Sequence, residues 1–418
     1  MFKRSIVSIG VGLLLFSVYG QASKIPVDPS ERKAAKPPAY KSTWVKLYGE
    51  DDDDIANAIV SLEDGQSAIA GTCQSFGAKR TDICVMKMND KGEMLWRLML
   101  GGEKEDEAKA ITRAADGGLF ILGTSKSFAK NYDKDIYVAK VTLDGKLVWE
   151  KSIGGERDEH AGGIAGTNDG GALVVGDTGS YGKRYKDIYI AKLNKDGKVL
   201  SSHTIGGEKG EEANGLARLK DGNFALVGMR EMDDGNYKDF FVMKLDQNGK
   251  NLWAKTFGGI YNDSLHGVTG TADGGFVAVG KTRSYGSEQT DLTVMKFTSE
   301  GKLLWHKIYG FKYYEYANAV TTTEDGGFMI VGGTNTLGIG GHSVYLLALD
   351  KEGKLIWSHV YGDRNKDTGH GIARLSDGTL IVVGESDSFE RARNFYMIKV
   401  RRNNVEQDNN KTAISKSE

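Results

Sequence analysis

Short apolar runs separated by polar turns recur along the chain at a nearly constant spacing. Typical runs are GFVAVG, DIYVAKV and KLLWHKIYG, which are rich in Val, Ile, Tyr and Phe. No segment places apolar residues at every third or fourth position over ten or more residues, which is the spacing that an amphipathic helix requires. The pattern therefore predicts many short β-strands and no long helix.

Tryptophan marks the repeat, because the spacing of the six tryptophans follows one period. Successive gaps are 52, 53, 104, 52 and 52 residues, and Ser201 stands where the doubled gap would place a further tryptophan. The six tryptophans and Ser201 give seven marks, and an Asp-Gly pair follows each mark after 20 residues. A unit of about 50 residues repeated seven times is typical of β-propeller blades. The tryptophans are Trp44, Trp96, Trp149, Trp253, Trp305 and Trp357.

Each unit contains four short strands, which we name A to D. Asp-Gly forms the turn between strands A and B, strand C often begins with Asp, and strand D carries the tryptophan. The first unit is preceded by a lone strand D at residues 43–49, and the last unit ends after strand C at NFYMIKV. The pattern predicts an all-β, seven-bladed β-propeller of four-stranded blades over residues 41–402. Pairing of the N-terminal strand with the C-terminal blade would close the ring.

The segments outside the repeats predict an exported protein. Residues 1–22 carry Lys3 and Arg4, an apolar run and small residues, which is typical of a secretory signal peptide, with an uncleaved anchor as the alternative. All four prolines lie within 23–40, which we interpret as a linker, and the polar residues 403–418 read as a disordered tail. We expect a periplasmic or extracellular location in a bacterium.

The amino-acid composition limits the kinds of partner that the chain is expected to bind. The formal net charge is −1, whereas nucleic acids and anionic membranes attract basic surfaces, so neither is an expected partner. No segment after the N-terminal run is apolar enough to span a membrane. We expect the mature chain to be a monomer whose partner is a protein, a peptide or a glycan.

Cys73 and Cys84 are the only cysteines, and they flank the loop between strands B and C of the first blade. Their placement puts them opposite each other across a hairpin, at a separation that a disulfide can bridge. An exported protein folds under oxidising conditions, so we predict a structural disulfide, with two buried thiols as the alternative.

Residues that recur in every unit are best explained by packing within the repeat. We expect each tryptophan to fill the gap between neighbouring blades. We expect the lysines of strand C to be solvated charges on the outer edge. These lysines are Lys87, Lys140, Lys192, Lys244, Lys296 and Lys399.

A carboxylate follows each mark after ten residues, at the start of strand A, which places seven of them on one face near the axis. One interpretation is that each accepts N–H groups of its own turn, and the other is an acidic ring that attracts a cation or a cationic ligand. The seven are Asp54, Asp106, Glu159, Glu211, Asp263, Glu315 and Asp367.

A metal site has one weak candidate, the acidic run of the first blade. Calcium needs several oxygen ligands at about 2.3–2.6 Å, which single carboxylates on a wide ring do not supply. Only the first blade offers a local acidic cluster of this length, formed by Asp51, Asp52, Asp53 and Asp54. No metal is predicted elsewhere.

The face formed by the B–C and D–A connections, here called the top face, is the expected binding surface. Its loops differ in every blade, whereas the turns of the opposite face are tight and nearly invariant. The clearest departure from the repeat is GFKYYEYAN, with Phe311, Tyr313, Tyr314 and Tyr316, which would suit a sugar or a partner protein. Packing under a neighbouring loop is the alternative for these aromatic residues.

Two histidines lie at a strand-A position that is Asn in other blades. His266 and His370 take the place of Asn57, Asn214 and Asn318, which favours polar residues that line the channel. Two blades separate the histidines, so a shared metal ion is not expected.

The unit W-x-K-x-x-G-G-x-x-x-D-x-A…D-G-G…G resembles the bacterial β-propeller repeat family abbreviated SBBP, over about residues 44–402. The resemblance implies an exported propeller. The turn LDGKLVW at 143–149 also resembles the tryptophan-docking motif of quinoprotein propellers, some of which are dehydrogenases that use PQQ. Those enzymes have eight blades, a vicinal cysteine pair and a calcium–PQQ site. This chain departs on blade number and cysteines, so neither PQQ nor Ca²⁺ is predicted.

These observations favour an exported, non-enzymatic propeller that binds a protein, peptide or glycan on its variable top face. No Ser/His/Asp, Cys/His or metal constellation stands out from the repeat. The alternative is a quinoprotein-like oxidoreductase, or a glycan hydrolase or lyase, that uses top-face carboxylates for proton transfer.

Overall fold

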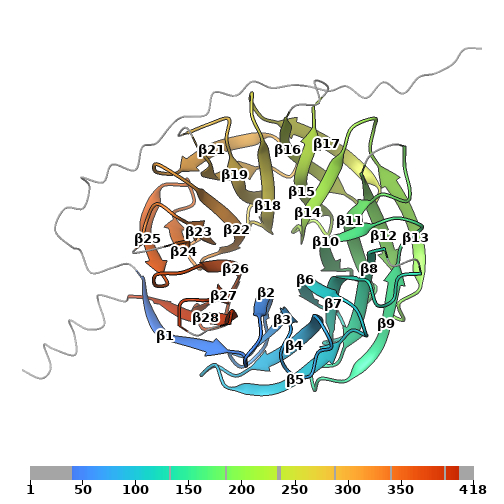
Figure 1. The fold of residues 1–418 in the computed structure, drawn as a ribbon. Coiled ribbons are helices and arrows are strands. Elements are labelled where there is room, and N and C mark those ends of the chain that lie inside the picture. The colour runs from blue at the N-terminus through green and yellow to red at the C-terminus, as the bar shows by residue number, and fades with distance from the viewer. Residues whose placement is uncertain are drawn as a thin grey trace, which may run out of the picture.

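The computed structural model describes residues 40–130, 133–183, 186–232, 237–286, 289–338, 341–389 and 392–403. These residues form seven antiparallel four-stranded sheets arranged as blades around a central axis (Figure 1). Strands account for all the regular structure of this part of the chain, and none of it is a helix that could cross a membrane. The predicted seven-bladed propeller is confirmed.

Strand A is innermost and strand D outermost in every blade (Figure 1). The A strands are β2 (Asp54–Ser61), β6 (Asp106–Arg113), β10 (Glu159–Gly166), β14 (Glu211–Arg218), β18 (Asp263–Gly270), β22 (Glu315–Thr322) and β26 (Asp367–Arg374). The B strands are β3 (Ser67–Cys73), β7 (Leu119–Ser125), β11 (Ala172–Thr178), β15 (Phe224–Glu231), β19 (Phe276–Thr282), β23 (Phe328–Thr334) and β27 (Leu380–Ser386). The C strands are β4 (Asp82–Met88), β8 (Asp135–Val141), β12 (Asp187–Leu193), β16 (Lys238–Leu245), β20 (Asp291–Phe297), β24 (Ser343–Leu349) and β28 (Asn394–Arg402). The D strands are β5 (Met94–Leu100), β9 (Leu147–Ile153), β13 (Val199–Ile205), β17 (Asn251–Phe257), β21 (Leu303–Tyr309), β25 (Leu355–Tyr361) and β1 (Tyr40–Tyr48).

The two ends of the described chain meet in the seventh blade, as predicted. Strand β1 pairs antiparallel with β28, with Trp44 opposite Lys399 and Tyr48 opposite Phe395 (Figure 1). The sheet order is β1-β28-β27-β26, so β1 supplies the strand D that the last repeat lacks. The expected signal peptide, the linker up to residue 39 and the tail from residue 404 lie outside the described residues.

The apolar core lies between blades and not at the axis. Ile83 and Val85 of the first blade, for example, share one cluster with Leu119 and Ile121 of the second. Each blade contributes one face to the cluster before it and the other face to the cluster after it. Burial of these two apolar faces therefore ties every blade to both neighbours.

The tryptophans contact the next blade from the outer strand. Trp96 donates a hydrogen bond from Nε1 to the carbonyl of Leu143 at 3.0 Å, and its ring covers Gly145 in the next C–D turn. A Cβ at Gly145 would lie 2.8 Å from that ring, which explains why glycine stands in the turn. All six rings are half-buried. The expectation that each tryptophan fills the gap between blades therefore holds only for the inner edge of its ring.

The lysines of strand C are not solvated outer charges, and the prediction for them is wrong. Lys192 and Lys296 are each 4% exposed, and each bonds the Asp of its own A–B turn at 2.9 Å. Lys244 also donates to the carbonyl of Ser299 in the next blade at 3.1 Å. These lysines thus join two turns within a blade, and one blade to the next, where their charge is paired.

Cys73 and Cys84 form a disulfide with a Cα–Cα distance of 5.9 Å, and both are fully buried. The hairpin register differs by two residues from the prediction, since Cys73 stands opposite Asp82 and Cys84 opposite Gly71. The bridge therefore runs diagonally between β3 and β4 on one face of the sheet.

Deletion of residues 41–48 should lower the melting temperature or cause association, because it exposes the edge of β28 and an apolar face of the seventh blade. Thermal unfolding and light scattering measure the two effects. Deletion of residues 23–36 is the control and should change neither. A monomer that melts with the parent after loss of 41–48 would refute the shared blade.

Replacement of both cysteines by serine should lower the free energy of unfolding by about 3 kcal/mol, the value expected for closing a loop of this length. Chemical denaturation measures the difference. Thiol titration of the unreduced, denatured parent is the control, and two free thiols per chain would contradict a disulfide in the mature protein.

Candidate functional site

The seven carboxylates that begin strand A hold the loops of the top face together. Glu159 accepts hydrogen bonds from the N–H of Gly155 in the D–A connection, from the hydroxyl of Thr178 and from the N–H of Ser180 in the B–C connection. All seven are at most 2% exposed. The group comprises Asp54, Asp106, Glu159, Glu211, Asp263, Glu315 and Asp367, and each accepts at least one such bond. Their negative charge is turned toward their own loops and away from solvent.

The acidic run of the first blade does not form a cluster. Asp53 binds the guanidinium of Arg393, with Oδ2 3.0 Å from Nε, and Asp54 is buried and accepts from the N–H of Ser75. Asp51 and Asp52 are exposed. Within the described residues, no group of three or more His, Cys, Asp or Glu side chains is placed to hold a metal ion.

A second layer of acids lies beside these carboxylates where blades meet. A Cβ at Gly101 would lie 2.4 Å from Oδ1 of Asp82 and 2.8 Å from Oδ2 of Asp106, so only glycine leaves room for both acids. Oδ1 of Asp82 is buried without a hydrogen-bond partner. Burial, helped by repulsion from Asp106, raises the pKa of Asp82 to about 6.

Each innermost strand carries one β-bulge, and the bulges direct six side chains and one glycine, Gly162, toward the axis. The register of strand A against strand B shifts by one residue in every blade. An extra residue at a bulge changes the direction in which a side chain points. We call the residues at the shift the polar ring: Asn57, Lys109, Gly162, Asn214, His266, Asn318 and His370.

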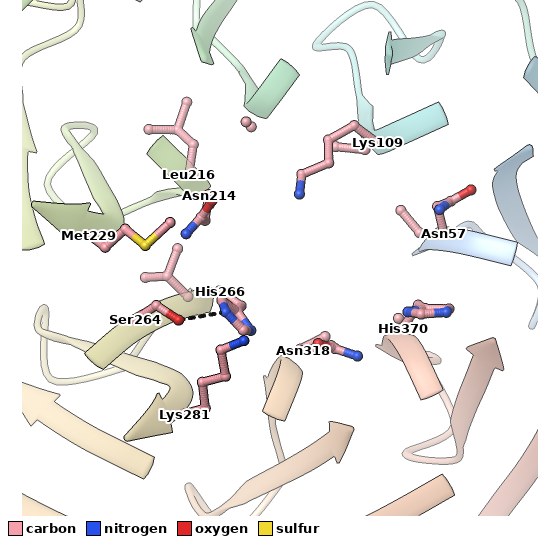
Figure 2. Close-up of a pocket in the computed structure, with 18 of the residues that line it drawn as sticks. Asn57, Lys109, Asn214, Leu216, Met229, Ser264, His266, Lys281, Asn318 and His370 are labelled. Atoms are coloured by element: carbon pink, nitrogen blue, oxygen red, sulfur yellow. Dashed lines mark hydrogen bonds between the residues drawn. The ribbon is translucent and has the colours of Figure 1, made fainter. Parts of the chain in front are cut away.

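Two residues further along each strand lies the apolar ring, with a Val, Ile or Leu in every blade. Its members are Ile59, Ile111, Ile164, Leu216, Val268, Val320 and Ile372. The polar ring and the apolar ring, except Val320, border a cavity of about 980 Å³ in the central channel (Figure 2). The cavity also reaches the top-face residues Tyr237 and Thr290. The cavity is large enough for a small ligand or the end of a chain.

The structure places His266 and His370 in this cavity on separate strands (Figure 2). His266 donates from Nδ1 to the carbonyl of Ala317 at 3.1 Å and accepts the hydroxyl of Ser264 on Nε2 at 2.8 Å. Asn318 makes the same type of link to the next blade, through the carbonyl of Gly369. Burial, with the positive charges of Lys281 and Lys109, lowers the pKa of His266 to about 4, so it is neutral at pH 7.

Three cations border the cavity without an acidic partner among the described residues. They are Lys109 from the polar ring and Lys281 from β19 (Figure 2), and Arg283 just after that strand. Their side chains are exposed to the cavity, although the blades surround them. Enclosure lowers the pKa of Lys109, with Asp177 acting in the opposite direction.

The acids nearest these cations are already engaged. Glu212 binds Lys238 at 3.0 Å, Glu231 accepts the N–H of Gly210, and Asp263 belongs to the buried carboxylates. Glu231 and Asp263 also border the cavity, but four cations, Lys109, Lys238, Lys281 and Arg283, outnumber these two acids. The lining therefore carries an excess of positive charge.

The predicted aromatic residues fall into two pairs. Tyr313 and Tyr314 are 43% and 45% exposed on the top face, and Thr290, which borders the cavity, donates its N–H to the carbonyl of Tyr313. Phe311 instead packs against the core of its blade, and Tyr316 is half-buried, 6.3 Å from the ring of His342. Only the first pair is available to a partner.

Exposed apolar groups of the fifth blade extend this surface. Ile260 is 70% exposed and Tyr261 43%, and Tyr261 contacts the edge of Tyr237 at the border of the cavity, 5.6 Å between centroids. We call Tyr237, Ile260, Tyr261, Tyr313 and Tyr314 the aromatic ledge. It lies over blades 4 to 6, on the side of the cavity that carries Lys281 and Arg283, whereas Lys109 extends from blade 2.

Sequence reasoning missed Lys109, Lys281, Arg283 and Ser264. Lys109 departs from the Asn and His of its ring and could have been noticed. Lys281 and Arg283 lie at the end of strand B, where the sequence varies between repeats. A difference from the other repeats at these positions therefore did not mark them as functional until the structure placed them at the cavity.

Comparison with known proteins supports the fold. No protein-family model matches the chain, and no curated protein matches it. A protein of unknown function from Dyadobacter fermentans is 12% identical, with a TM-score of 0.54 over 88% of this chain and 100% of that one. The WD40 domain of Neurospora crassa Pan2 is 10% identical, with a TM-score of 0.52 over 87% and 96%. At these identities the likeness concerns architecture, and the SBBP and quinoprotein resemblances remain resemblances.

Asp82→Asn should stabilise the protein at pH 8 and not at pH 4. The pKa of Asp82 is raised in the folded state, so stability is lost as the pH rises from about 4 to about 6, and the full cost is present at pH 8 and almost none at pH 4. Partial exposure screens the effect, and we expect a gain of roughly 1–2 kcal/mol at pH 8. Chemical denaturation at both pH values measures it.

The control for this prediction is Asp144→Asn. Bonds from Thr142 and Lys146 lower the pKa of the Asp144 carboxyl to about 2, so loss of its charge should not stabilise the protein at pH 8. An equal gain for Asp82→Asn at both pH values would show that charge is not the cause.

Proposed function

We propose that this protein is an exported, non-enzymatic propeller that binds a segment of a partner polypeptide on its top face, over blades 4 to 6. The observation that carries the proposal is the aromatic ledge beside a cavity that opens on the same face. Tyrosine and large apolar residues are enriched where proteins bind each other, and a cavity next to them can receive an inserted side chain or chain end.

A polypeptide suits this surface better than a glycan. The ledge includes Ile260, which is 70% exposed and offers no hydrogen bond to sugar hydroxyls. One face of Tyr313 carries the ammonium of Lys312, 5.1 Å from the ring centroid, which takes a position that a stacked sugar would need. Apolar side chains and backbone groups of a peptide match this mixture.

Export is supported by the N-terminal signal pattern and by the disulfide. Lys3 and Arg4 precede an apolar run, and the bridge between Cys73 and Cys84 suits an oxidising compartment.

The enzymatic alternative has less support. The top-face carboxylates already accept hydrogen bonds inside their loops, which leaves them poorly placed to transfer protons to a substrate. Ser264 and His266 form a hydrogen bond like that of a nucleophile and its base. Ser264 is only 5% exposed, however, and an imidazole with a pKa of about 4 is a weak base.

A random-peptide library and a glycan array applied to the mature protein test this proposal. We expect selected peptides whose affinity falls about tenfold in the Tyr313→Ser/Tyr314→Ser variant, because exposed interface aromatics often contribute more than 1 kcal/mol. Thermal stability should change little, as for exposed sites.

Tyr181→Ser is the matched control, since Tyr181 is 44% exposed on the top face of the third blade. It should bind the selected peptides as the parent does. Selection of glycans and no peptides, or equal loss in the Tyr181 variant, would contradict the proposal.

A further inference from the structure

The cavity changes character with depth. Strand A runs from the top face inward, so a ligand entering from that face meets the polar ring first and the apolar ring next. Two residues of a strand span about 7 Å. The anionic and apolar parts of a matching ligand must therefore lie within a few bonds of each other.

The cations set the charge of the ligand at the upper level. Lys109 extends into the channel, and Lys281 lies beside His266 (Figure 2). With Arg283, these groups form no ion pair with an acid among the described residues, and the cations of the lining outnumber its two acids, Glu231 and Asp263. A carboxylate would gain charge-assisted hydrogen bonds and relieve the mutual repulsion of the cations.

The apolar level is only one residue deep. Two residues further along each strand, at the next position on the same side, the ring is no longer apolar, and it includes three arginines. Its members are Ser61, Arg113, Gly166, Arg218, Gly270, Thr322 and Arg374. One aliphatic side chain fits between the two polar levels, and a long acyl chain would bring methylene groups against the arginines.

We infer that the cavity binds the C-terminal residue of the partner polypeptide, with its carboxylate at Lys109, Lys281 and Arg283 and an aliphatic side chain in the apolar ring. This inference rests on the proposed binding of a polypeptide at the top face. The free carboxylate and the side chain of a C-terminal residue share one Cα, which matches the short spacing between the two levels. The preceding residues of the partner would leave through the mouth and cross the aromatic ledge.

A pair of fluorescent heptapeptide pools tests the inference. Both end in leucine, one with a free carboxylate and the other with a C-terminal amide, and fluorescence anisotropy measures their affinity for the mature protein. Amidation should weaken binding about 10- to 100-fold, the effect of losing charge-assisted bonds. N-acetyl-leucine should compete with the free pool, and decanoate should not.

Cavity variants locate the effect. Lys109→Gln and Lys281→Gln should weaken the free pool and reduce its advantage over the amide. Lys220→Gln is the control, because Lys220 bonds the carbonyl of Ala272 on the opposite face and its loss changes the net charge equally. Equal affinity of the two pools, equal weakening by Lys220→Gln, or stronger competition by decanoate would overturn the inference.

The ledge variant separates this inference from the proposed function. If Tyr313→Ser/Tyr314→Ser weakens both pools and amidation changes nothing, the top face binds polypeptides and the C-terminal preference is wrong. If the ledge variant binds both pools as the parent does, the proposed function itself fails.

Discussion

The pairing of β1 with β28 is the constraint on which the rest of the structure depends. Each blade packs only against its two neighbours, so an open ring would leave an apolar blade face uncovered at both ends. Residues 40–48 complete the seventh blade, and Trp44 then docks on Gly92 of the first blade as Trp96 docks on Gly145 of the next. The central cavity, with lining residues from all seven blades, exists only in the closed ring.

The two faces of the propeller have different roles in the structure. On the bottom face, buried lysines such as Lys192 and Lys296 join turns of fixed sequence, so substitution there affects blade packing directly. On the top face, the buried carboxylates hold only the bases of the loops, through residues such as Gly155 and Ser180. Beyond these anchors, single loop residues such as Tyr285 and Leu337 still pack against the blades, whereas others such as Tyr313 and Tyr314 are exposed. The loops can therefore vary between blades, and a binding surface can form there without loss of the ring.

The repeat predicted what depends on periodicity, and it failed where side chains from neighbouring strands of one blade meet. Blade number, closure and the pairing of Cys73 with Cys84 all follow from regular spacing and are confirmed. The burial of Lys192 could not be predicted from the repeat. The sequence of its strand does not show that Asp169, from another part of the same blade, lies over the end of that strand. The same limit applies to the candidate site. Lys281 belongs to β19 and acts beside His266 of β18, a proximity that spacing within one strand does not report.

The cavity cations are the strongest sign that the channel does more than complete the ring. Lys109 occupies a position where Asn214 and Asn318 bond the backbone of the next blade, so asparagine is the residue that the fold itself favours there. Lysine at this position makes no such bond in the described residues, and its enclosure disfavours the charged form. Asparagine recurs at this position and suits the packing of the blades better than lysine. A residue that suits the fold less well than the one that recurs at its position is expected at a functional site. A ligand carboxylate would supply the hydrogen-bond partner that Lys109 lacks. The positive charge of the cavity is therefore better explained by ligand binding than by the needs of the fold.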